Sequence, residues 1–468
     1  MKAMRDASDT APRLWLRSKD TKMTLINRRH QRAVGQGFFH TAELEAEDGR
    51  KFRYVYDCGA MKKYETERNA RIDEYLSAVG ANAELDVLFI SHIHFDHISG
   101  IERLLDKTKG LKVDTIVMPL INVADRLFAY ARAVNEDPAT INSTFFRELI
   151  VDPANALGRL GPRQLLFVRR GSPDGGAPGS TGEDDDGPDG APDIPRVWGG
   201  ERAGGLYWKL IGQGTGYEYE QRFTESDGTE AVTNVAEVDD TLAIATAGGE
   251  SCFEWILSPF VDPTIQSKKD LFLGELASAR GMPVSDLKSW LADTQNVADL
   301  LLNGLPDLTA AYEVVANDFN LTSLCLYSGP KARDGSTESV YQASLGSYFF
   351  GPTSLKEIGW LATGDAALKA KIRAAAFAKH YGTHMGKTGT LTVPHHGSDH
   401  NHNPELVKNI DASFHIVAAD AFSKWKHPGS KMVQCVASMG RFLSVVTGNS
   451  KSEVEETISV RCLPNRKP

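Results

Sequence analysis

The densest group of side chains that could do chemistry is the heptapeptide Ser91–His97, with the sequence SHIHFDH. It places three imidazoles and one carboxylate within six positions. His92 and His94 are two residues apart, so on an extended segment they face the same side. Asp96 and His97 follow where the chain turns into the next element, so they can face a second position nearby. Neutral imidazole and carboxylate are ligands for Zn, Fe or Mn, and the segment has no thiols of the kind that a structural zinc site would use.

Three segments further along the chain bring more candidate ligands to the ends of expected strands. The sequence LATGD ends an apolar run in a Thr-Gly turn that carries Asp365, and VPHHGS carries the pair His395 and His396. His427 follows in a Lys-His-Pro loop. Taken singly, the Gly-Asp turn and the His-Pro loop are common structural features. The alternative interpretation of Ser91–His97 is a cluster of surface histidines without a function. Three histidines in so short a segment are improbable by chance, because the whole chain has only 13 histidines in 468 residues.

Short apolar runs predict the strands that would hold these side chains at their ends. Val87–Ile90 leads into the first histidines, Trp360–Thr363 into Asp365, and Leu391–Val393 into the histidine pair. Strands and helices are mixed throughout, which indicates an α/β fold with layered sheets. We also expect strands at Phe38–Leu44, Phe52–Tyr56, Val113–Met118, Leu321–Tyr327, Phe414–Ala418, Leu443–Val446 and Ile458–Cys462, and helices at Ile101–Leu105, Asp125–Val134, Asp286–Leu302 with Ser285 as N-cap, Ala366–Lys379 and Met432–Met439.

The candidate ligands lie on both sides of a long middle region. We therefore predict one domain in two halves, residues 14–120 and 308–465, split by an insertion at residues 121–307. Within the insertion, residues 171–194 are dense in Gly, Pro, Ser and Asp and contain no aromatic residue, which predicts a disordered acidic loop. This loop holds seven acidic and no basic side chains, so the formal charge of −9 falls to −2 without it.

Composition narrows the class of protein further. The chain is 41% hydrophobic and 24% charged, as ordinary globular proteins are. Its five cysteines are scattered without a CxxC pair, so we expect no disulfide scaffold and a reducing, cytoplasmic environment. We expect no transmembrane helix and no secretory signal, because a long apolar run is missing and Met1–Ser18 is polar. The acidic balance argues against coating nucleic acid through bulk charge, although the chain outside the acidic loop is near neutral.

Together these motifs resemble the signature of the metallo-β-lactamase superfamily of hydrolases. The HxHxDH pattern of His92–His97, with HHGS behind it, is similar to that signature, and Asp57-Cys58-Gly59 resembles an early strand-end Asp of the superfamily. One subgroup is the hydrolase domain of ComEC-type DNA-uptake proteins with its stand-alone relatives. The order VGQG (Val34–Gly37), NLTSL (Asn320–Leu324), TGD and HHGS resembles this subgroup.

The chain departs from these patterns in two places. Phe38 follows VGQG where the subgroup often has Asp. No histidine lies between His97 and His380, where some superfamily members carry a third metal-binding histidine. The downstream histidines would fill that role here, as in the bacterial phosphorylcholine esterases, which have a similar HHG block and a later His.

The resemblance implies an α/β fold in a four-layer αββα sandwich with a large mixed insertion, and a site for two divalent metal ions. Zn is the expected metal, with Mn or Fe as alternatives. The implied ligands of one ion are His92, His94 and either His395 or His396. The implied ligands of the other are Asp96, His97 and His427, and Asp365 would bridge the two ions. Asp57 and Ser398 would surround the ligands without binding metal.

Such a centre predicts a hydrolase whose nucleophile is a hydroxide shared by two metal ions. Asp96, Asp365 and His396 would have catalytic roles, and His400 and His402 are candidates for substrate binding against the alternative of a solvated loop. The order of the motifs favours a phosphodiester substrate, either a small molecule or a nucleic acid. A lactone, thioester or β-lactam hydrolase is one alternative, and a non-catalytic metal-bound protein whose insertion binds a protein partner is another. No membrane partner is expected.

Overall fold

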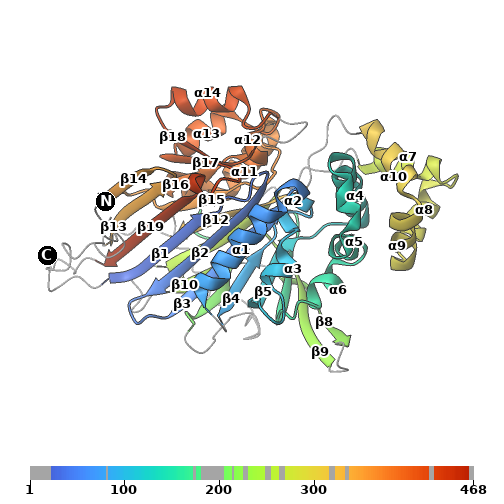
Figure 1. The fold of residues 1–468 in the computed structure, drawn as a ribbon, viewed down its shortest axis with the longest axis horizontal. Helices are drawn as coiled ribbons and strands as arrows, with labels where there is room; N and C mark the ends of the chain where they lie inside the picture. Colours follow the sequence, from blue (N-terminus) through green and yellow to red (C-terminus); the bar gives the residue numbers. More distant parts are fainter. Residues whose placement is uncertain are drawn as a thin grey trace, which may run out of the picture.

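The structure is a computed structural model that describes residues 23–80, 83–171, 175–180, 205–212, 215–224, 230–247, 254–262, 269–315, 322–331, 337–420 and 426–462. Two large β-sheets lie face to face, and helices cover their outer faces (Figure 1). This is the expected αββα arrangement of an α/β fold. None of the helices in the described part of the chain has the length and hydropathy that crossing a bilayer requires.

The first sheet has the strand order β14-β13-β19-β1-β2-β3-β4-β5-β6-β9-β8, and the second has the order β18-β17-β16-β15-β12-β11-β10-β7. The strands are β1 (Met23–Gln31), β2 (Gly37–Ala46), β3 (Lys51–Ala60), β4 (Glu84–Phe89), β5 (Lys112–Pro119), β6 (Gln164–Val168), β7 (Trp208–Ile211), β8 (Thr215–Thr224), β9 (Glu230–Val238), β10 (Ala243–Ala247), β11 (Glu254–Val261), β12 (Leu324–Pro330), β13 (Thr337–Leu345), β14 (Tyr348–Ser354), β15 (Gly359–Ala362), β16 (Thr388–Thr392), β17 (Phe414–Ala418), β18 (Phe442–Val446) and β19 (Val454–Cys462).

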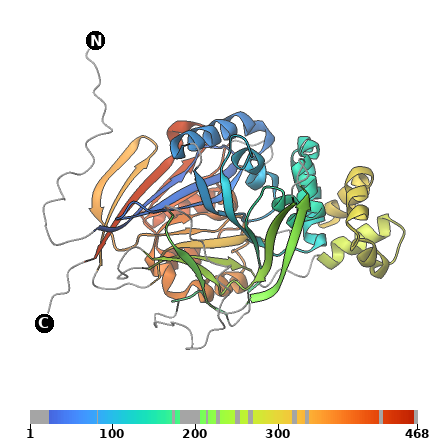
Figure 2. The same cartoon turned by 90° about the horizontal axis from the view of Figure 1, so that it is seen from below.

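Helices connect these strands and pack on both sides of the sandwich (Figure 2). The α-helices are α1 (Glu65–Val79), α2 (Phe95–Ile98), α3 (Ile101–Leu104), α4 (Val123–Glu136), α5 (Thr144–Val151), α6 (Pro153–Gly158), α7 (Lys269–Ala279), α8 (Val284–Trp290), α9 (Thr294–Asn303), α10 (Leu305–Val315), α11 (Lys371–Tyr381), α12 (Pro394–Gly397), α13 (Pro404–Ile410) and α14 (Ser430–Ser438). Short 3-10 helices are η3 (Lys62–Tyr64), η4 (Pro138–Asn142), η7 (Gly382–Lys387) and η8 (Ser450–Ser452).

Each sheet contains a parallel block, and these blocks explain where the candidate ligands gather. In the first sheet β3, β4, β5 and β6 are parallel neighbours. In the second sheet β15, β16, β17 and β18 are parallel neighbours. The predicted site residues follow β4, β15, β16 and β17, so they come from the carboxyl ends of parallel strands, which share one edge of their sheet.

The space between the sheets is a core of large side chains. Trp208, Trp255 and Trp360 from the second sheet face Tyr54 and Tyr56 from the first, and all five are fully buried. Burial of apolar surface contributes about 25 cal/mol per Å², so this layer stabilises the packing of the two sheets against each other.

One charged pair is enclosed in this core. Arg29 of β1 donates to both carboxylate oxygens of Glu456 in β19, at 2.7 and 3.0 Å. Tyr341 and Thr390 also donate to Glu456, so the buried carboxylate is fully surrounded by donors.

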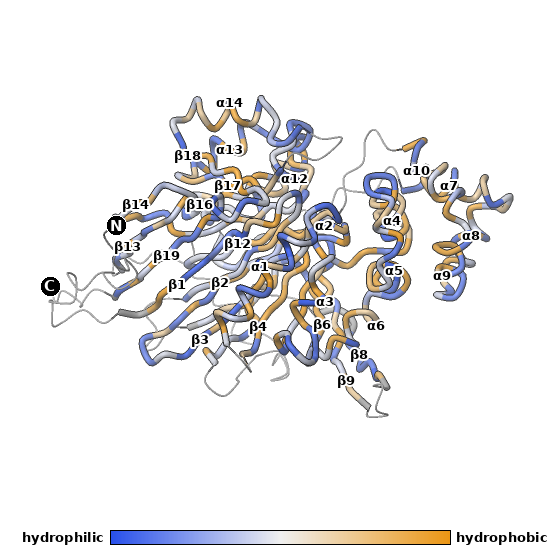
Figure 3. The backbone as a smooth tube through the Cα atoms, viewed as in Figure 1, coloured by the Kyte–Doolittle hydropathy of each residue, from blue (hydrophilic) through white to orange (hydrophobic). Residues whose placement is uncertain are grey.

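The outer faces carry separate apolar cores. Helices α1 to α6 pack on the first sheet, and α11 and α13 pack on the second. Helices α7 to α10 lie beyond α4 and α5 at one end of the molecule, and share their core (Figures 1 and 2). Apolar and hydrophilic stretches alternate along these helices (Figure 3), as expected where one face is buried.

The region predicted as an insertion contributes to both sheets. Its strands β6, β8 and β9 extend the first sheet, and β7, β10 and β11 extend the second. Its helices α4 and α5 lie against the first sheet close to the candidate ligands (Figure 1). The predicted boundaries at residues 121 and 307 stay a prediction.

Several local expectations were wrong. The single helix expected at Asp286–Leu302 is two helices, α8 and α9. Helix α8 ends at Trp290, and Asp293 is the N-cap of α9, where its side chain accepts from the Gln295 amide. Ser285 is not an N-cap: Pro283 occupies that position without a side-chain cap, and Ser285 lies inside α8. The helix expected from Ala366 begins only at Lys371.

The predicted disordered loop at residues 171–194 is partly described. Residues 172–174 and 181–194 lie outside the described residues. Residues 175–180 are ordered against α11 and η7: the Ala177 amide donates to the carbonyl of His380, and Ser180 accepts from Thr383. Ala177 and Ser180 are buried, so the prediction of disorder is wrong for this stretch. Composition alone could not reveal this packing of residues 175–180.

Candidate metal centre

The loop after β4 carries the first group of site residues into the interior. His92, His94, Asp96 and His97 are each only 1% exposed. Asp96 and His97 sit in the short helix α2. This helix lies directly on β2 and β3, where a Cβ added at Gly37 or Gly59 would come within 2.5 to 2.9 Å of the backbone at Asp96 and His97. The second glycine of VGQG and the glycine of Asp-Cys-Gly therefore make room for the ligand loop.

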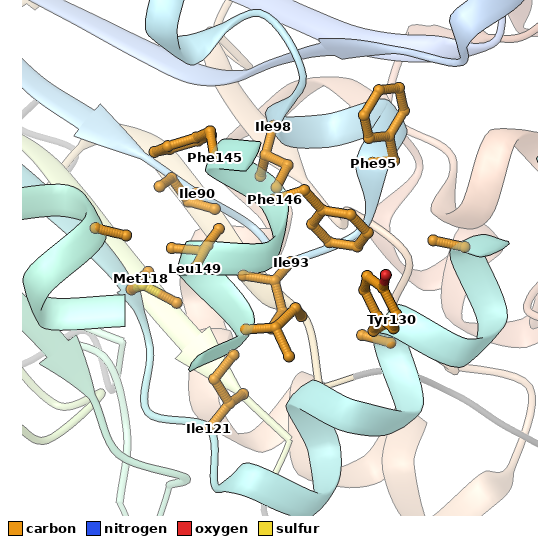
Figure 4. Close-up of a cluster of buried hydrophobic side chains, with 14 of the residues drawn as sticks. Ile90, Ile93, Phe95, Ile98, Met118, Ile121, Tyr130, Phe145, Phe146 and Leu149 are labelled. Atoms are coloured by element: carbon orange, nitrogen blue, oxygen red, sulfur yellow. The ribbon is translucent and has the colours of Figure 1, made fainter. Parts of the chain in front are cut away.

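Apolar residues alternate with the ligands and anchor the loop from below. Ile90, Ile93, Phe95 and Ile98 pack with residues of α4 and α5 in one cluster (Figure 4). The Phe95 and Phe146 rings are 5.9 Å apart, edge to face. Because apolar packing of this density leaves few alternative side-chain positions, the histidines between these anchors are held in place.

Asp57 orients two of the histidines through one carboxylate. It accepts from the Ser91 amide at 2.7 Å and from the Ser91 hydroxyl at 2.6 Å, and its Oδ2 lies 2.8 Å from His97 Nδ1. Since the carboxylate only accepts, His97 Nδ1 carries a proton. The Ser91 hydroxyl donates its hydrogen bond to Asp57, so its oxygen accepts from His92 Nδ1 at 2.9 Å. Both histidines therefore point their Nε2 atoms at the centre.

The pair His395 and His396 is oriented by the same logic. Asn401 donates its amide to the carbonyls of Asp365 and Ala366, so its Oδ1 is fixed as the acceptor for His395 Nδ1 at 2.9 Å. His396 Nδ1 donates to the carbonyl of Ala418 at 2.6 Å. Each histidine thus keeps an Nε2 lone pair for the centre, so the orientation allows both to be ligands.

These nitrogens converge on two carboxylates. His92 Nε2 and His97 Nε2 each lie 3.5 Å from an oxygen of Asp365, and His395 Nε2 lies 3.6 Å from the same carboxylate. His396 Nε2 lies 2.9 Å from Asp96 Oδ2. At this centre, two sets of described side chains have ligand atoms within 4.8 Å of one another: His92, His97 and Asp365 form one, and Asp96, His97 and His396 form the other.

The chemistry of this donor set fits divalent metal ions. Within the described residues, His92 Nε2, His97 Nε2 and both oxygens of Asp365 are buried without a hydrogen-bond partner. Buried polar atoms are rarely left in that state unless something else binds them. Imidazole nitrogens whose other ring nitrogen donates to a carboxylate or carbonyl are the usual form of metal-binding histidines.

The charges of the cluster are strongly coupled. Burial favours the neutral form of His97, but the carboxylates of Asp96 and Asp57 hold its pKa well above the usual value. Burial also opposes ionisation of Asp365, but His395 and His92 hold its pKa well below the usual range. In His92, burial and the neighbouring His97 lower the pKa to about 4. Without metal, protons on the histidines therefore balance the charge of the carboxylates. A bound cation would balance that charge instead and displace these protons.

Asp365 reaches the centre through a tight turn at Gly364, whose positive φ glycine adopts without strain. Gly364 has a φ of +48°, and a Cβ there would lie 2.3 Å from Ser323 Oγ and 3.0 Å from the Tyr56 hydroxyl. Ser323 also accepts from the Asp365 amide at 3.1 Å. The NLTSL and TGD segments therefore meet at this point, although Asn320 and Leu321 lie outside the described residues. His395 and His396 have positive φ values as well, of 50° and 53°, which is typical of strain held at functional sites.

Sequence reasoning missed two charged residues beside the ligands. Arg132 and Glu136 are one turn apart on α4 and form an ion pair at 2.7 Å between Nε and Oε1. Glu136 Oε2 lies 2.7 Å from His94 Nε2, and Arg132 Nη2 lies 3.1 Å from His395 Nε2. Although burial lowers it, Asp96 and Glu136 raise the pKa of His94 to about 9. The only sequence signal was their spacing of four residues, which ordinary surface ion pairs share, and Glu136 lies beyond the predicted helix Asp125–Val134.

The other predicted site residues lie around the cluster at different distances. The His427 ring is 5.7 Å from His395 and 6.2 Å from His396, between centroids. Ser398 is buried and shapes the turn after the histidine pair, accepting from the His400 amide at 3.2 Å. His400 is exposed, and His402 is buried near His415 and Asp399. Phe38, at the position where the subgroup often has Asp, is stacked on His97.

Comparisons with known proteins bear on the family. Residues 46–113, which include the HxHxDH segment, match the family model described as "Metallo-beta-lactamase superfamily". No curated protein is similar enough to this chain to be matched.

Two solved structures are similar to the chain. A beta-lactamase domain protein from Burkholderia ambifaria has 15% identity and a TM-score of 0.20, over 47% of this chain and 49% of that one. A long form of RNase Z from yeast has 10% identity and a TM-score of 0.28, over 92% of this chain and 41% of that one. The chain thus spans less than half the length of either protein.

The matched segment runs from the end of β2 to the start of β5 and carries the ligand loop. Two sheets covered by helices on both outer faces surround it. This segment is thus similar to the metallo-β-lactamase superfamily, and the arrangement of the sheets and helices around it is consistent with that fold.

Proposed function

We propose that this protein is a metal-dependent hydrolase that acts on a phosphodiester. The observation that carries the proposal is the convergence of four Nε2 atoms, each fixed by an acceptor at Nδ1, on the carboxylates of Asp96 and Asp365. This donor set is suited to two divalent ions, of which Zn is the first candidate and Mn or Fe are alternatives.

The proposed ligands come from two groups, His92, His97 and Asp365 around one position and Asp96, His97 and His396 around another. His97 can bind only one of the two ions, because its Nδ1 carries a proton and only Nε2 has a free lone pair. His94, His395 and His427 lie at the edge of these groups and complete the proposed set. This distribution differs from the expected partition, since His396 lies with Asp96 and not with His92. When bound, the ions would act as Lewis acids that activate a water and stabilise charge on the substrate.

The residues of the chain would do the remaining work. Asp57 and Ser91 hold the histidine tautomers, and the carboxylates of Asp96 and Asp365 offer acceptors for the proton of the attacking water. Hydrolysis forms a bond between the water oxygen and phosphorus and breaks the bond to one ester oxygen, which takes a proton and leaves as an alcohol.

The order VGQG, NLTSL, TGD and HHGS supports the phosphodiester assignment through its resemblance to the ComEC-type subgroup. A direct test is turnover of bis-p-nitrophenyl phosphate and of single-stranded DNA by protein supplied with Zn or Mn, with and without a chelator. We expect cleavage that the chelator abolishes. Faster turnover of a lactone or of nitrocefin would favour a carbon-ester or β-lactam substrate, and a protein that binds metal but cleaves none of these would contradict the proposal.

A further inference from the structure

The side chains around the candidate metal centre differ in their exposure to solvent. The side chains of His92, His94, Asp96 and His97 are 1% exposed, whereas Arg132 is 8%, Glu136 11% and His395 16% exposed. His427 is also partly exposed and lies next to His395. The more exposed side of the centre is therefore the one beside Arg132 of α4, a helix that belongs to neither ligand loop.

Arg132 contacts His395, and a metal ion bound to His395 would take the place of this contact. Its Nη2 lies 3.1 Å from His395 Nε2, whose Nδ1 is committed to Asn401. A neutral imidazole has one free lone pair, so His395 Nε2 can accept from Arg132 or bind an ion, but not both. An ion bound to His395 would leave this end of a nearly buried guanidinium in need of another acceptor, because an unpaired buried charge is costly.

Glu136 fixes the direction of that guanidinium. Its Oε1 accepts from Arg132 Nε at 2.7 Å, while its Oε2 lies 2.7 Å from His94. Arg132 Nη2 is thereby left beside His395, and a guanidinium fork matches two oxygens of a phosphate. The charge also suits an anion: two divalent ions and Arg132 exceed the carboxylates of Asp57, Asp96, Asp365 and Glu136 by one positive charge.

We propose that Arg132 binds a negatively charged oxygen of the substrate at the more exposed side of the metal centre, and so selects phosphoesters over neutral esters. This inference rests on the proposed function. It adds a substrate-binding residue from α4 to the loops that carry the ligands.

The test compares Arg132→Gln, Arg132→Lys and a matched control, Arg103→Gln, whose guanidinium pairs with Asp73 on the surface. Binding of inorganic phosphate to the metal-loaded protein is measured by calorimetry, alongside metal content. We expect Arg132→Gln to weaken phosphate binding about 10- to 100-fold, the size of a charge-assisted hydrogen-bonded contact. Arg132→Lys should fall between it and the parent, since it keeps the charge without the fork, and Arg103→Gln should match the parent.

A second readout separates substrate binding from a structural role. The ratio of kcat/KM for bis-p-nitrophenyl phosphate to that for p-nitrophenyl acetate should fall at least about tenfold in Arg132→Gln. Equal losses on both esters, loss of metal from both Arg132 variants, or unchanged phosphate binding would overturn the proposal. If the parent cleaves no phosphodiester, the proposed function fails, while the phosphate-binding measurement still decides the role of Arg132.

Discussion

Asp57→Asn isolates the part of the centre that sets histidine tautomers. Asparagine has the shape of aspartate and tolerates the left-handed backbone at this position, where φ is 57°. Its oxygen can still accept from the Ser91 amide, but its NH₂ would face two donors, the Ser91 hydroxyl and His97 Nδ1. His97 would then move its proton to Nε2. The Ser91 hydroxyl would turn towards His92 and cause the same shift there.

The magnitude follows from the two ligands affected. Loss of an outer partner of a metal-binding histidine costs about 10- to 100-fold in metal affinity. Two such losses amount to roughly 10²- to 10⁴-fold, or about 3–5 kcal/mol. Ser91→Ala, which disturbs the link to His92 while leaving the one to His97, should cost only about 10- to 100-fold.

The assay is competition for Zn between the protein and a chromophoric chelator at neutral pH, with circular dichroism to confirm that each variant is folded. A folded Asp57→Asn protein that binds Zn within about threefold of the parent would refute the tautomer argument. So would an equal loss in Asp57→Asn and Ser91→Ala, because Asp57 orients two histidines and Ser91 only one.

Three further predictions concern the frame around the site. Gly364→Ala should destabilise the protein by about 1–3 kcal/mol in denaturant unfolding, because the new Cβ would strain a positive φ and crowd Ser323; unchanged stability would contradict this. Glu456→Gln should cost about 3–5 kcal/mol by leaving Arg29 buried without its counter-charge, and a double exchange of both for methionine should cost less. Burial raises the pKa of Asp240 to about 7 from the ordinary 3.8, so the folded state binds this proton more tightly. Stability should therefore fall as pH rises from about 4 through 7 and level off above that, and Asp240→Asn should flatten this slope in thermal unfolding.

The site residues that could be predicted from the sequence are those that belong to short motifs directly after predicted strands. The histidine segment follows an apolar strand directly, and Asp365, His395 and His396 follow strands too, so parallel strand ends could be expected to gather them. The order of the motifs along the chain then supported the prediction that these residues form one metal site.

The residues that the sequence did not reveal depend on contacts between distant elements. Arg132 and Glu136 look like a surface ion pair until α4 is packed beside the ligand loop. The orientation of the histidine pair required Asn401 and the carbonyl of Ala418, which no local pattern connects to it. Helix breaks such as that at Asp293 were missed because apolar periodicity continues across them.

The central claim is that one buried cluster of histidines and carboxylates holds two metal ions. The most direct measurement is the metal content of the purified protein by elemental analysis, with Asp365→Ala beside it. We predict about two metal ions per chain in the parent and loss of most of the metal in the variant, since Asp365 lies within 3.6 Å of His92, His97 and His395. Full retention of metal by a folded Asp365→Ala protein, or a parent that binds no divalent metal, would contradict the claim.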